Sequence, residues 1–231
     1  MKRTALLFLA GLAVLPAHSD ELTGHPAADA SGFETLFDGK DLSKLKTEGN
    51  WQVQSDGSLK LTPREGEKGW TRYHHYLWLP GEYGDFTVDF EFQYTKGGNS
   101  GLYFRCADDI DPTKSGFEVQ ILDSYGREKI TREDCGAIFD CLAPSVNAVR
   151  PPGKWNHYTI TCSGSRITVV LNGQEVIAMD LDRWTEAHRN PDGTPNKFNS
   201  AYKEMPRVGN IGLQYHGHPV WYRNLKIRTL G

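Results

Sequence analysis

Hydrophobic and polar residues alternate along much of the chain, which is the pattern of strands half buried in a sheet. The longest run is DFTVDFEFQYT at residues 85–95, where every second residue is aromatic or aliphatic. Two shorter runs flank Asp56-Gly57 and another two flank Asn172-Gly173, and both dipeptides are hairpin signals. No segment keeps a helical period beyond a single turn. About ten short strands of this kind predict an all-β domain, folded as a two-sheet β-sandwich or jelly roll.

The N-terminal segment has the parts of a secretory signal peptide. It combines a basic start, an apolar stretch at residues 5–15 and a small-x-small cleavage site, AHS, at residues 17–19. The sequence therefore predicts a signal peptide at residues 1–19 and export to the periplasm or the extracellular space. The small, polar residues 20–32 are interpreted as a tether, followed by a single domain at 33–231. No later stretch is long and apolar enough to span a membrane.

Charge and cysteine content narrow the function classes. The net charge of −3 comes from 26 basic and 29 acidic residues that are interspersed, so no nucleic-acid partner is expected. The 10 Tyr, 10 Phe and 6 Trp residues suit either a large core or a surface that stacks on sugars.

Cysteines in an exported protein predict at least one disulfide, with Cys135 the favoured participant and the pairing open. The four cysteines are Cys106, Cys135, Cys141 and Cys162.

The stretch GFEVQILD, residues 116–123, alternates aliphatic residues with a carboxylate and an amide. The same phase occurs in SGLYFRC and IGLQYHG, so three strands would carry polar side chains on one face of a sheet. An Arg–Glu–His set with amides and a phenol suits the recognition of polyols, whereas the alternative is an ordinary solvated sheet face. Asn99 in GGNSG fits either a turn or a backbone approach to a ligand. The predicted polar face comprises Tyr103, Arg105, Glu118, Gln120, Gln214 and His216.

Glu118, Gln120 and Asp123 also resemble in form the Glu-x-Asp-x-x-Glu strand of laminarinase-type retaining glucanases. The middle carboxylate of that pattern is Gln120 here, which weakens a two-carboxylate mechanism. Asp123 points to the opposite face from Glu118 in a regular strand, and a β-bulge would be needed to bring it back.

Several motifs together resemble the bacterial 3-keto-disaccharide hydrolase family, also described as 3-keto-glucoside 1,2-lyase/3-keto-2-hydroxy-glucal hydratase and formerly a domain of unknown function. The resemblance runs from about Phe33 to Leu230 and implies a concanavalin-like β-sandwich. One departure is Tyr215, where the family pattern has Asp. The motifs that carry the resemblance are LFDGKDLS, GGNSGLYFR, GFEVQILDS, CGAIFD, PPGKWNHYTI, LNG, NPDGTPNKF and GNIGLQYHGHPVWYRNLKIRTL.

The resemblance implies an exported enzyme that cleaves a 3-keto-glycoside or a related oligosaccharide. A ketone at carbon 3 acidifies the hydrogen on carbon 2, so a base can start a β-elimination that expels the group on carbon 1, and water then adds to the glucal. His216 and Glu118 are expected to act as base and acid, in either order, with Arg105 on the enolate or keto oxygen.

The remaining site residues have binding roles in this interpretation. Asn99, Tyr103, Gln120, Gln214 and Asp123 would bind substrate, and Asp123 would alternatively orient a partner or bind a metal. A divalent metal ion could also replace Arg105 as the electrophile. The alternatives are a non-catalytic carbohydrate-binding module and a conventional retaining glycosidase. The aglycone and the oligomeric state are left open.

Overall fold

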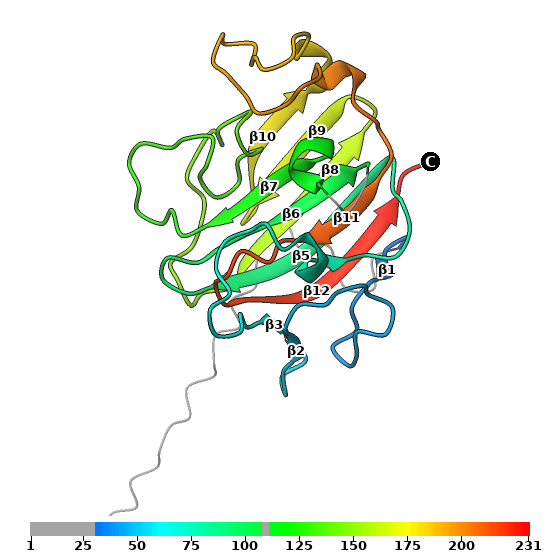
Figure 1. Cartoon of the computed structure of the whole chain (residues 1–231), viewed down its shortest axis with the longest axis vertical. Helices are drawn as coiled ribbons and strands as arrows, with labels where there is room; N and C mark the ends of the chain where they lie inside the picture. The colour runs from blue at the N-terminus through cyan, green and yellow to red at the C-terminus, as the bar shows by residue number, and fades with distance from the viewer. Residues whose placement is uncertain (1–30, 108–110) are drawn as a thin grey trace, which may run out of the picture.

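The computed structural model describes residues 31–107 and 111–231 and is almost entirely β in its regular structure. Two antiparallel sheets pack face to face, which confirms the predicted two-sheet sandwich (Figure 1). The predicted signal peptide, residues 1–19, and nearly all of the tether lie outside the described residues. No described helix is long and apolar enough to cross a membrane.

The larger sheet contains the long alternating run found in the sequence. Its strands are arranged in the order β10-β9-β8-β5-β12-β3-β2, and β1 pairs with β12 beside that path. The strands are β1 (Glu34–Thr35), β2 (Trp51–Val53), β3 (Leu59–Leu61), β5 (Phe86–Tyr94), β8 (Asn156–Ser163), β9 (Arg166–Leu171), β10 (Gln174–Asp180) and β12 (Val220–Thr229).

The smaller sheet has the order β4-β11-β6-β7. Its strands are β4 (Leu77–Trp78), β6 (Asn99–Cys106), β7 (Phe117–Leu122) and β11 (Asn210–Leu213). Helical structure is limited to one turn of α-helix and three short 3₁₀ segments in the described residues. These are α1 (Pro112–Ser115), η1 (Tyr73–His75), η2 (Leu181–Arg183) and η3 (Tyr202–Glu204).

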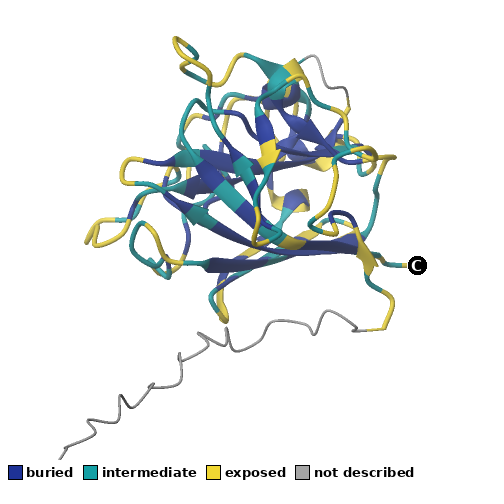
Figure 2. Ribbon diagram, turned by 90° about the horizontal axis from the view of Figure 1, so that it is seen from below, coloured by how far each residue is buried: buried dark blue, intermediate teal, exposed yellow. Residues whose placement is uncertain are grey.

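The core lies between the two sheets, because each sheet turns its aliphatic and aromatic positions inward. Phe90 of β5 and Val119 of β7 are fully buried members of this core. In Figure 2 the strands are mostly buried and the exposed residues are concentrated in the connections. Burial of this much apolar surface is the main source of stability in a sandwich of this kind.

The hairpin between β9 and β10 turns at Asn172-Gly173, as the sequence predicts. Both residues have positive φ angles, 52° and 81°, the geometry that an Asn-Gly turn requires. The Asn172 side chain also accepts a hydrogen bond from the His157 backbone N–H at 2.9 Å, which ties the turn to β8.

Two expectations differ from the structure. The segment CGAIFD at residues 135–140, whose apolar residues suggest one of the short strands, instead forms turns that run along β7, with one isolated bridge between Val119 and Ile138. The prediction of a disulfide is wrong for this structure, since all four cysteines are free and buried. Cys135 instead lies with its Sγ 3.3 Å from the Tyr158 hydroxyl, and Cys141 Sγ lies beside the Tyr202 hydroxyl. A small, weakly polar thiol is well accommodated in an apolar core.

Candidate active site

The outer face of the smaller sheet holds a cavity of about 600 Å³, large enough for a sugar and part of its substituent. Its floor comes from β6, β7 and the segment after β11, and its rim comes from connecting segments. The lining residues are Trp70, Asn99, Tyr103, Thr113, Lys114, Glu118, Gln120, Leu122, Arg127, Glu133, Phe139, Lys197, Gln214 and His216.

Strand register explains why the polar side chains of the floor share one face. β6 and β7 pair antiparallel with Tyr103 opposite Glu118 and with Gly101 opposite Gln120. Residues opposite each other in an antiparallel pair point to the same side of the sheet. The prediction that Tyr103, Glu118 and Gln120 point to the same face of the sheet is therefore confirmed. Gln214 joins them because its backbone N–H donates to the Gly101 carbonyl at 2.8 Å.

The carboxyl group of Glu118 is buried in the floor of the cavity. The Tyr103 hydroxyl donates a 2.6 Å hydrogen bond to its Oε2. A Cβ atom at position 101 would come within 2.5 Å of Oε1, so Gly101 leaves the space that this carboxyl group occupies. Burial raises the pKa of Glu118 to about 7, although Lys197 and the hydrogen bond from Tyr103 act to lower it. Glu118 is thus able to carry or release a proton near neutral pH.

His216 lies in the segment between β11 and β12 and faces the same cavity. Its Nε2 is 3.4 Å from the Nδ2 of Asn99, a residue of β6. Burial lowers the pKa of His216 below its ordinary value, and the neighbouring ring of His218 lowers it further. The two imidazole rings are stacked with their centroids 5.8 Å apart. His216 is therefore a neutral imidazole at neutral pH.

Several buried polar atoms in this cavity have no hydrogen-bond partner among the described residues. They are Asn99 Oδ1, Gln120 Oε1, Gln214 Oε1 and His216 Nδ1. Buried polar groups are nearly always paired in folded proteins, and an unpaired one costs free energy. A ligand with several hydroxyl groups would satisfy them together, which is the behaviour expected of a sugar site.

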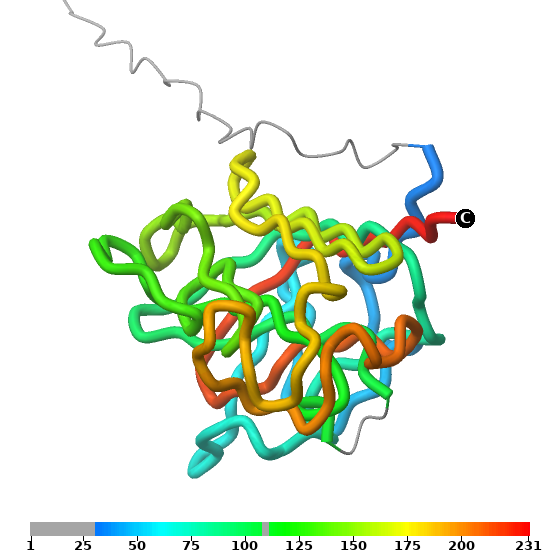
Figure 3. The backbone as a smooth tube through the Cα atoms, turned by 90° about the horizontal axis from the view of Figure 1, so that it is seen from above, coloured from blue at the N-terminus to red at the C-terminus, as the bar shows by residue number. Residues whose placement is uncertain are grey.

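Lys197 lines the cavity, although no local sequence pattern marks it as a site residue. It belongs to the long polar segment 189–207, which contributes to the rim of the site. Its backbone N–H donates to Asp140 Oδ2 at 2.8 Å, and its ammonium group lies 4.9 Å from the Phe139 ring centroid. The segment is also joined to its neighbour by a 2.8 Å bond from Arg132 Nη1 to Thr194 Oγ1 (gold to orange in Figure 3). The only sequence signal was the unusual length of this segment.

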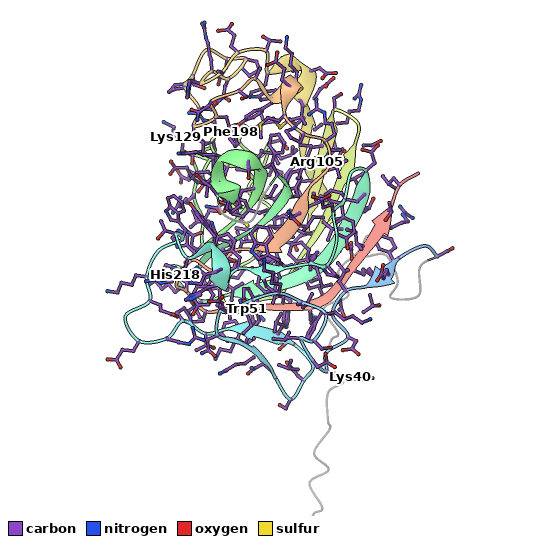
Figure 4. All side chains as sticks on the ribbon, turned by 45° about the vertical axis from the view of Figure 1, so that its right-hand side comes forward. Lys40, Trp51, Arg105, Lys129, Phe198 and His218 are labelled. Atoms are coloured by element: carbon purple, nitrogen blue, oxygen red, sulfur yellow. The ribbon has the colours of Figure 1, made fainter. Side chains whose placement is uncertain are left out.

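Arg105 was expected in the cavity, and this expectation is wrong. Strand β11 has a single residue between Asn210 and Gly212. The stretch of β6 opposite it has two residues, Phe104 and Arg105, which form a β-bulge. The bulge changes the side of the sheet to which Arg105 points. Arg105 has a φ of 52° and is fully buried. Figure 4 shows it far from His218, which stacks on the cavity residue His216.

The guanidinium group of Arg105 binds connections of the larger sheet. Nη1 donates to the Gly164 carbonyl at 2.9 Å, and Nη2 donates to the Gly84 carbonyl and to Asp85 Oδ1, both at 3.1 Å. Arg105 therefore joins the two sheets and does not reach the substrate cavity.

Asp123 was expected to bind substrate or metal, but it does not line the cavity. It follows the last residue of β7, and its Oδ2 accepts a 2.8 Å hydrogen bond from the Gly97 backbone N–H. The side chain thus supports the turn between β5 and β6. Within residues 31–107 and 111–231, no group of three or more His, Cys, Asp or Glu side chains is arranged to hold a metal ion.

Comparison with known proteins finds a matching family model and similar proteins of known structure. Residues 32–228 match the family model described as 3-keto-alpha-glucoside-1,2-lyase-like domain. A 3-keto-disaccharide hydrolase of Bacteroides thetaiotaomicron is 23% identical over 232 residues, covering 87% of this chain and 80% of that protein. A crystal structure from Parabacteroides distasonis, provisionally named a glycosyl hydrolase, is 34% identical with a TM-score of 0.74, covering 86% of this chain and 99% of the other.

A more distant solved structure shares the fold alone. It is a Bacillus subtilis protein of unknown function with a galectin-like fold, which is 15% identical with a TM-score of 0.54. The alignment covers 85% of this chain and 94% of that one.

Proposed function

The chain belongs to the family of 3-keto-alpha-glucoside-1,2-lyase-like domains, and on that premise we propose that it cleaves 3-keto-glycosides by elimination across carbons 1 and 2, followed by hydration. The observation that carries this proposal is the pair of proton-transfer groups in one cavity. Glu118 has a pKa raised to about 7, and His216 has a lowered pKa. Two titratable groups shifted apart by their surroundings are the usual basis of acid–base assignment.

The order of the two pKa values assigns the roles. Between the lowered pKa of His216 and about pH 7, Glu118 carries a proton and His216 does not. His216 then acts as the base and Glu118 as the acid. The Nδ1 atom of His216 has no hydrogen-bond partner among the described residues, so its lone pair is free to accept a proton in the tautomer that carries its hydrogen on Nε2.

Each bond change in the elimination has a defined donor and acceptor. His216 takes the proton from carbon 2, and the electron pair of that C–H bond forms the enolate of the 3-ketone. The enolate expels the group on carbon 1, and the leaving oxygen receives the proton of Glu118. Water then adds across the new double bond, with its hydroxyl on carbon 1 and a proton returned to carbon 2, which restores both side chains.

Negative charge develops on the oxygen at carbon 3, and a nearby cation stabilises it. Lys197 is placed for this role, since it lines the cavity and lies close enough to Glu118 to lower its pKa. Gln120, Gln214 and Asn99 would bind the sugar hydroxyls through their unpaired amide atoms. Lys197 thus takes the role for which the sequence suggested Arg105.

The two alternative functions have less support. A binding module needs no carboxyl group with a pKa near 7 and no imidazole in the same cavity. A retaining glycosidase needs two carboxylates about 5 Å apart, and Asp123, the expected second carboxylate, supports a turn instead. Export is proposed only from the N-terminal sequence, which matches a signal peptide.

The test is incubation of the protein with a 3-keto-glucoside and with its unoxidised parent in D₂O, with the products followed by NMR. Cleavage of the keto substrate with deuterium at carbon 2 is expected, because the proton removed by His216 exchanges with solvent. Cleavage of the parent glycoside alone would contradict the proposal.

A further inference from the structure

A second cavity of about 390 Å³ lies next to the active-site cavity and has no role in the proposed reaction. Its walls combine an aromatic side with hydroxyl, carboxyl and imidazole groups, the composition of a site that binds sugar rings. The residues that line it are Lys46, Thr47, Glu48, Thr71, Tyr73, His74 and Trp78.

The two cavities share a thin wall. Trp70 and Thr113 line the active-site cavity, whereas Tyr73 lines the second one. The Trp70 and Tyr73 ring centroids are 6.1 Å apart, and the Tyr73 hydroxyl is 3.4 Å from Thr113 Oγ1. A ligand that leaves the first cavity over Trp70 therefore meets Tyr73 next.

The aromatic residue at the wall between the two cavities, Trp70, is exposed to solvent, and further aromatic rings pack against one another next to it. Trp70 is 41% exposed, which is unusual for a tryptophan. Beneath it, the Tyr73 and Tyr76 rings lie 5.7 Å apart, and Tyr76 stacks on Trp78 at 5.9 Å. An exposed aromatic face on such a base, here that of Trp70, is suited to stacking against the flat face of a ligand ring.

The segment that carries Trp70 is attached firmly to the rest of the site. The Trp70 carbonyl accepts a 2.9 Å hydrogen bond from the Tyr76 hydroxyl. Glu67 accepts a hydrogen bond from Tyr215 and lies 3.5 Å from His75 Nδ1. Tyr215 directly precedes His216, so the residue that departs from the family pattern links the Trp70 segment to the segment that carries His216. The aromatic wall is thus preorganised, which reduces the cost of binding.

We propose that the two cavities form one extended groove, in which the leaving group of the substrate is a saccharide of at least two units. The first unit would stack on Trp70, and the next would lie against Tyr73 and Trp78, with its hydroxyls toward Thr47, Glu48 and His74. The inference rests on the proposed function, because it places the 3-keto sugar beside Glu118 and His216. A saccharide fits better than an aryl group, because the second cavity offers hydrogen-bonding groups from Thr47, Glu48 and His74 beside its aromatic surface.

The experiment compares kcat/KM for a 3-keto-disaccharide and a 3-keto-trisaccharide of the same linkage, with an aryl 3-keto-glucoside as a third substrate. The wild-type protein should prefer the trisaccharide by about tenfold, the equivalent of one ring contact. Tyr73→Ala should remove most of that preference. Tyr73→Phe, which removes only the hydroxyl, should keep it. Tyr125→Ala is the matched control, because Tyr125 is exposed but lines neither cavity.

Equal kcat/KM for the two saccharides in the wild-type protein overturns the inference, as does an equal loss on both in Tyr73→Ala. A higher kcat/KM for the aryl substrate than for the trisaccharide also contradicts it. Absence of turnover on every keto substrate contradicts the proposed function instead. Calorimetric binding of the unoxidised trisaccharide and disaccharide then tests the groove directly, and equal affinities would reject it.

Discussion

Burial shifts the two proton-transfer groups in opposite directions because it disfavours the charged form of each. The charged form of Glu118 is the deprotonated one, so its pKa rises, whereas the charged form of His216 is the protonated one, so its pKa falls. A single physical cause therefore produces an acid that holds its proton and a base that lacks one. The same site would lose this arrangement if water filled it, since both groups would return toward their ordinary pKa values.

Glu118→Gln tests the acid at the scale of one residue. The amide keeps the size and much of the hydrogen bonding of the carboxyl group but cannot transfer a proton. Turnover of a 3-keto-glycoside should fall by about 10²–10⁴-fold, while binding persists. In the wild-type protein, kcat/KM should fall as the pH rises above about 7, because Glu118 loses its proton. Steady-state kinetics between pH 5 and 9 measure both effects, and a variant with normal turnover would exclude Glu118 as the acid.

Strand β6 shows how one extra residue changes what a strand presents. Up to Tyr103 its side chains follow the alternation read from the sequence, and the bulge then places Arg105 on another side. The guanidinium group of Arg105 is hydrogen-bonded to Gly84, Asp85 and Gly164. It is fully buried, and Asp85 balances its charge. Such a group is costly to remove, because a large side chain with no exposed surface would leave a cavity behind it.

Arg105→Ala should therefore affect stability and leave the chemistry nearly intact. Loss of this fully buried side chain and of its bond to the partly exposed Asp85 is expected to lower the free energy of unfolding by about 2–5 kcal/mol. Urea denaturation measures this change, and kcat at a temperature where the variant is folded should stay within a few-fold of the wild-type value. Arg189→Ala removes an exposed ion pair with Glu186 and serves as the control, with an expected change of about 0–1 kcal/mol. A large loss of kcat in a fully folded Arg105→Ala protein would restore the catalytic interpretation.

The alternation of residues was enough to predict the sandwich and the shared face of Tyr103, Glu118 and Gln120. These features depend on a period of two, which the sequence displays directly. The bulge at Arg105 depends on a count of residues in two strands that are far apart in the sequence. Lys197 is positioned by hydrogen bonds between distant segments, such as its own backbone bond to Asp140. Local patterns contain neither kind of information.

At the scale of the whole molecule, the free cysteines bear on export. An oxidising compartment acts on thiolates, and burial raises the pKa of Cys135 to about 11 and those of Cys141 and Cys162 to about 12. The fold therefore protects its thiols without a disulfide, and free cysteines are compatible with the predicted signal peptide.

Thiol titration checks this protection. The native protein should react negligibly with a thiol reagent, and the unfolded, unreduced protein should show four free thiols. A reducing agent should leave the melting temperature unchanged, because no disulfide contributes to stability. Two free thiols in the unfolded protein would instead show that a disulfide forms.

The raised pKa of Glu118 also makes the stability of the whole molecule depend on pH. The folded protein binds this proton up to about pH 7, whereas the unfolded chain releases it near the ordinary value of 4.5. The folded state therefore binds more protons between these two values, so stability falls as the pH rises through this window and stays lower above it. The full shift corresponds to about 3 kcal/mol at pH 8.

Glu118→Gln removes this titration and should be more stable than the wild-type protein at pH 8, by up to about 3 kcal/mol. Near pH 4 the two proteins should have similar stability, because the wild-type carboxyl group is then protonated in both states. Urea denaturation at both pH values measures the difference, and Glu133→Gln, a change at the exposed rim of the same cavity, is the control. A difference that is the same at pH 4 and pH 8 would contradict the raised pKa. A variant that gains stability as it loses turnover would show that the site maintains a buried carboxyl group at the expense of folding stability.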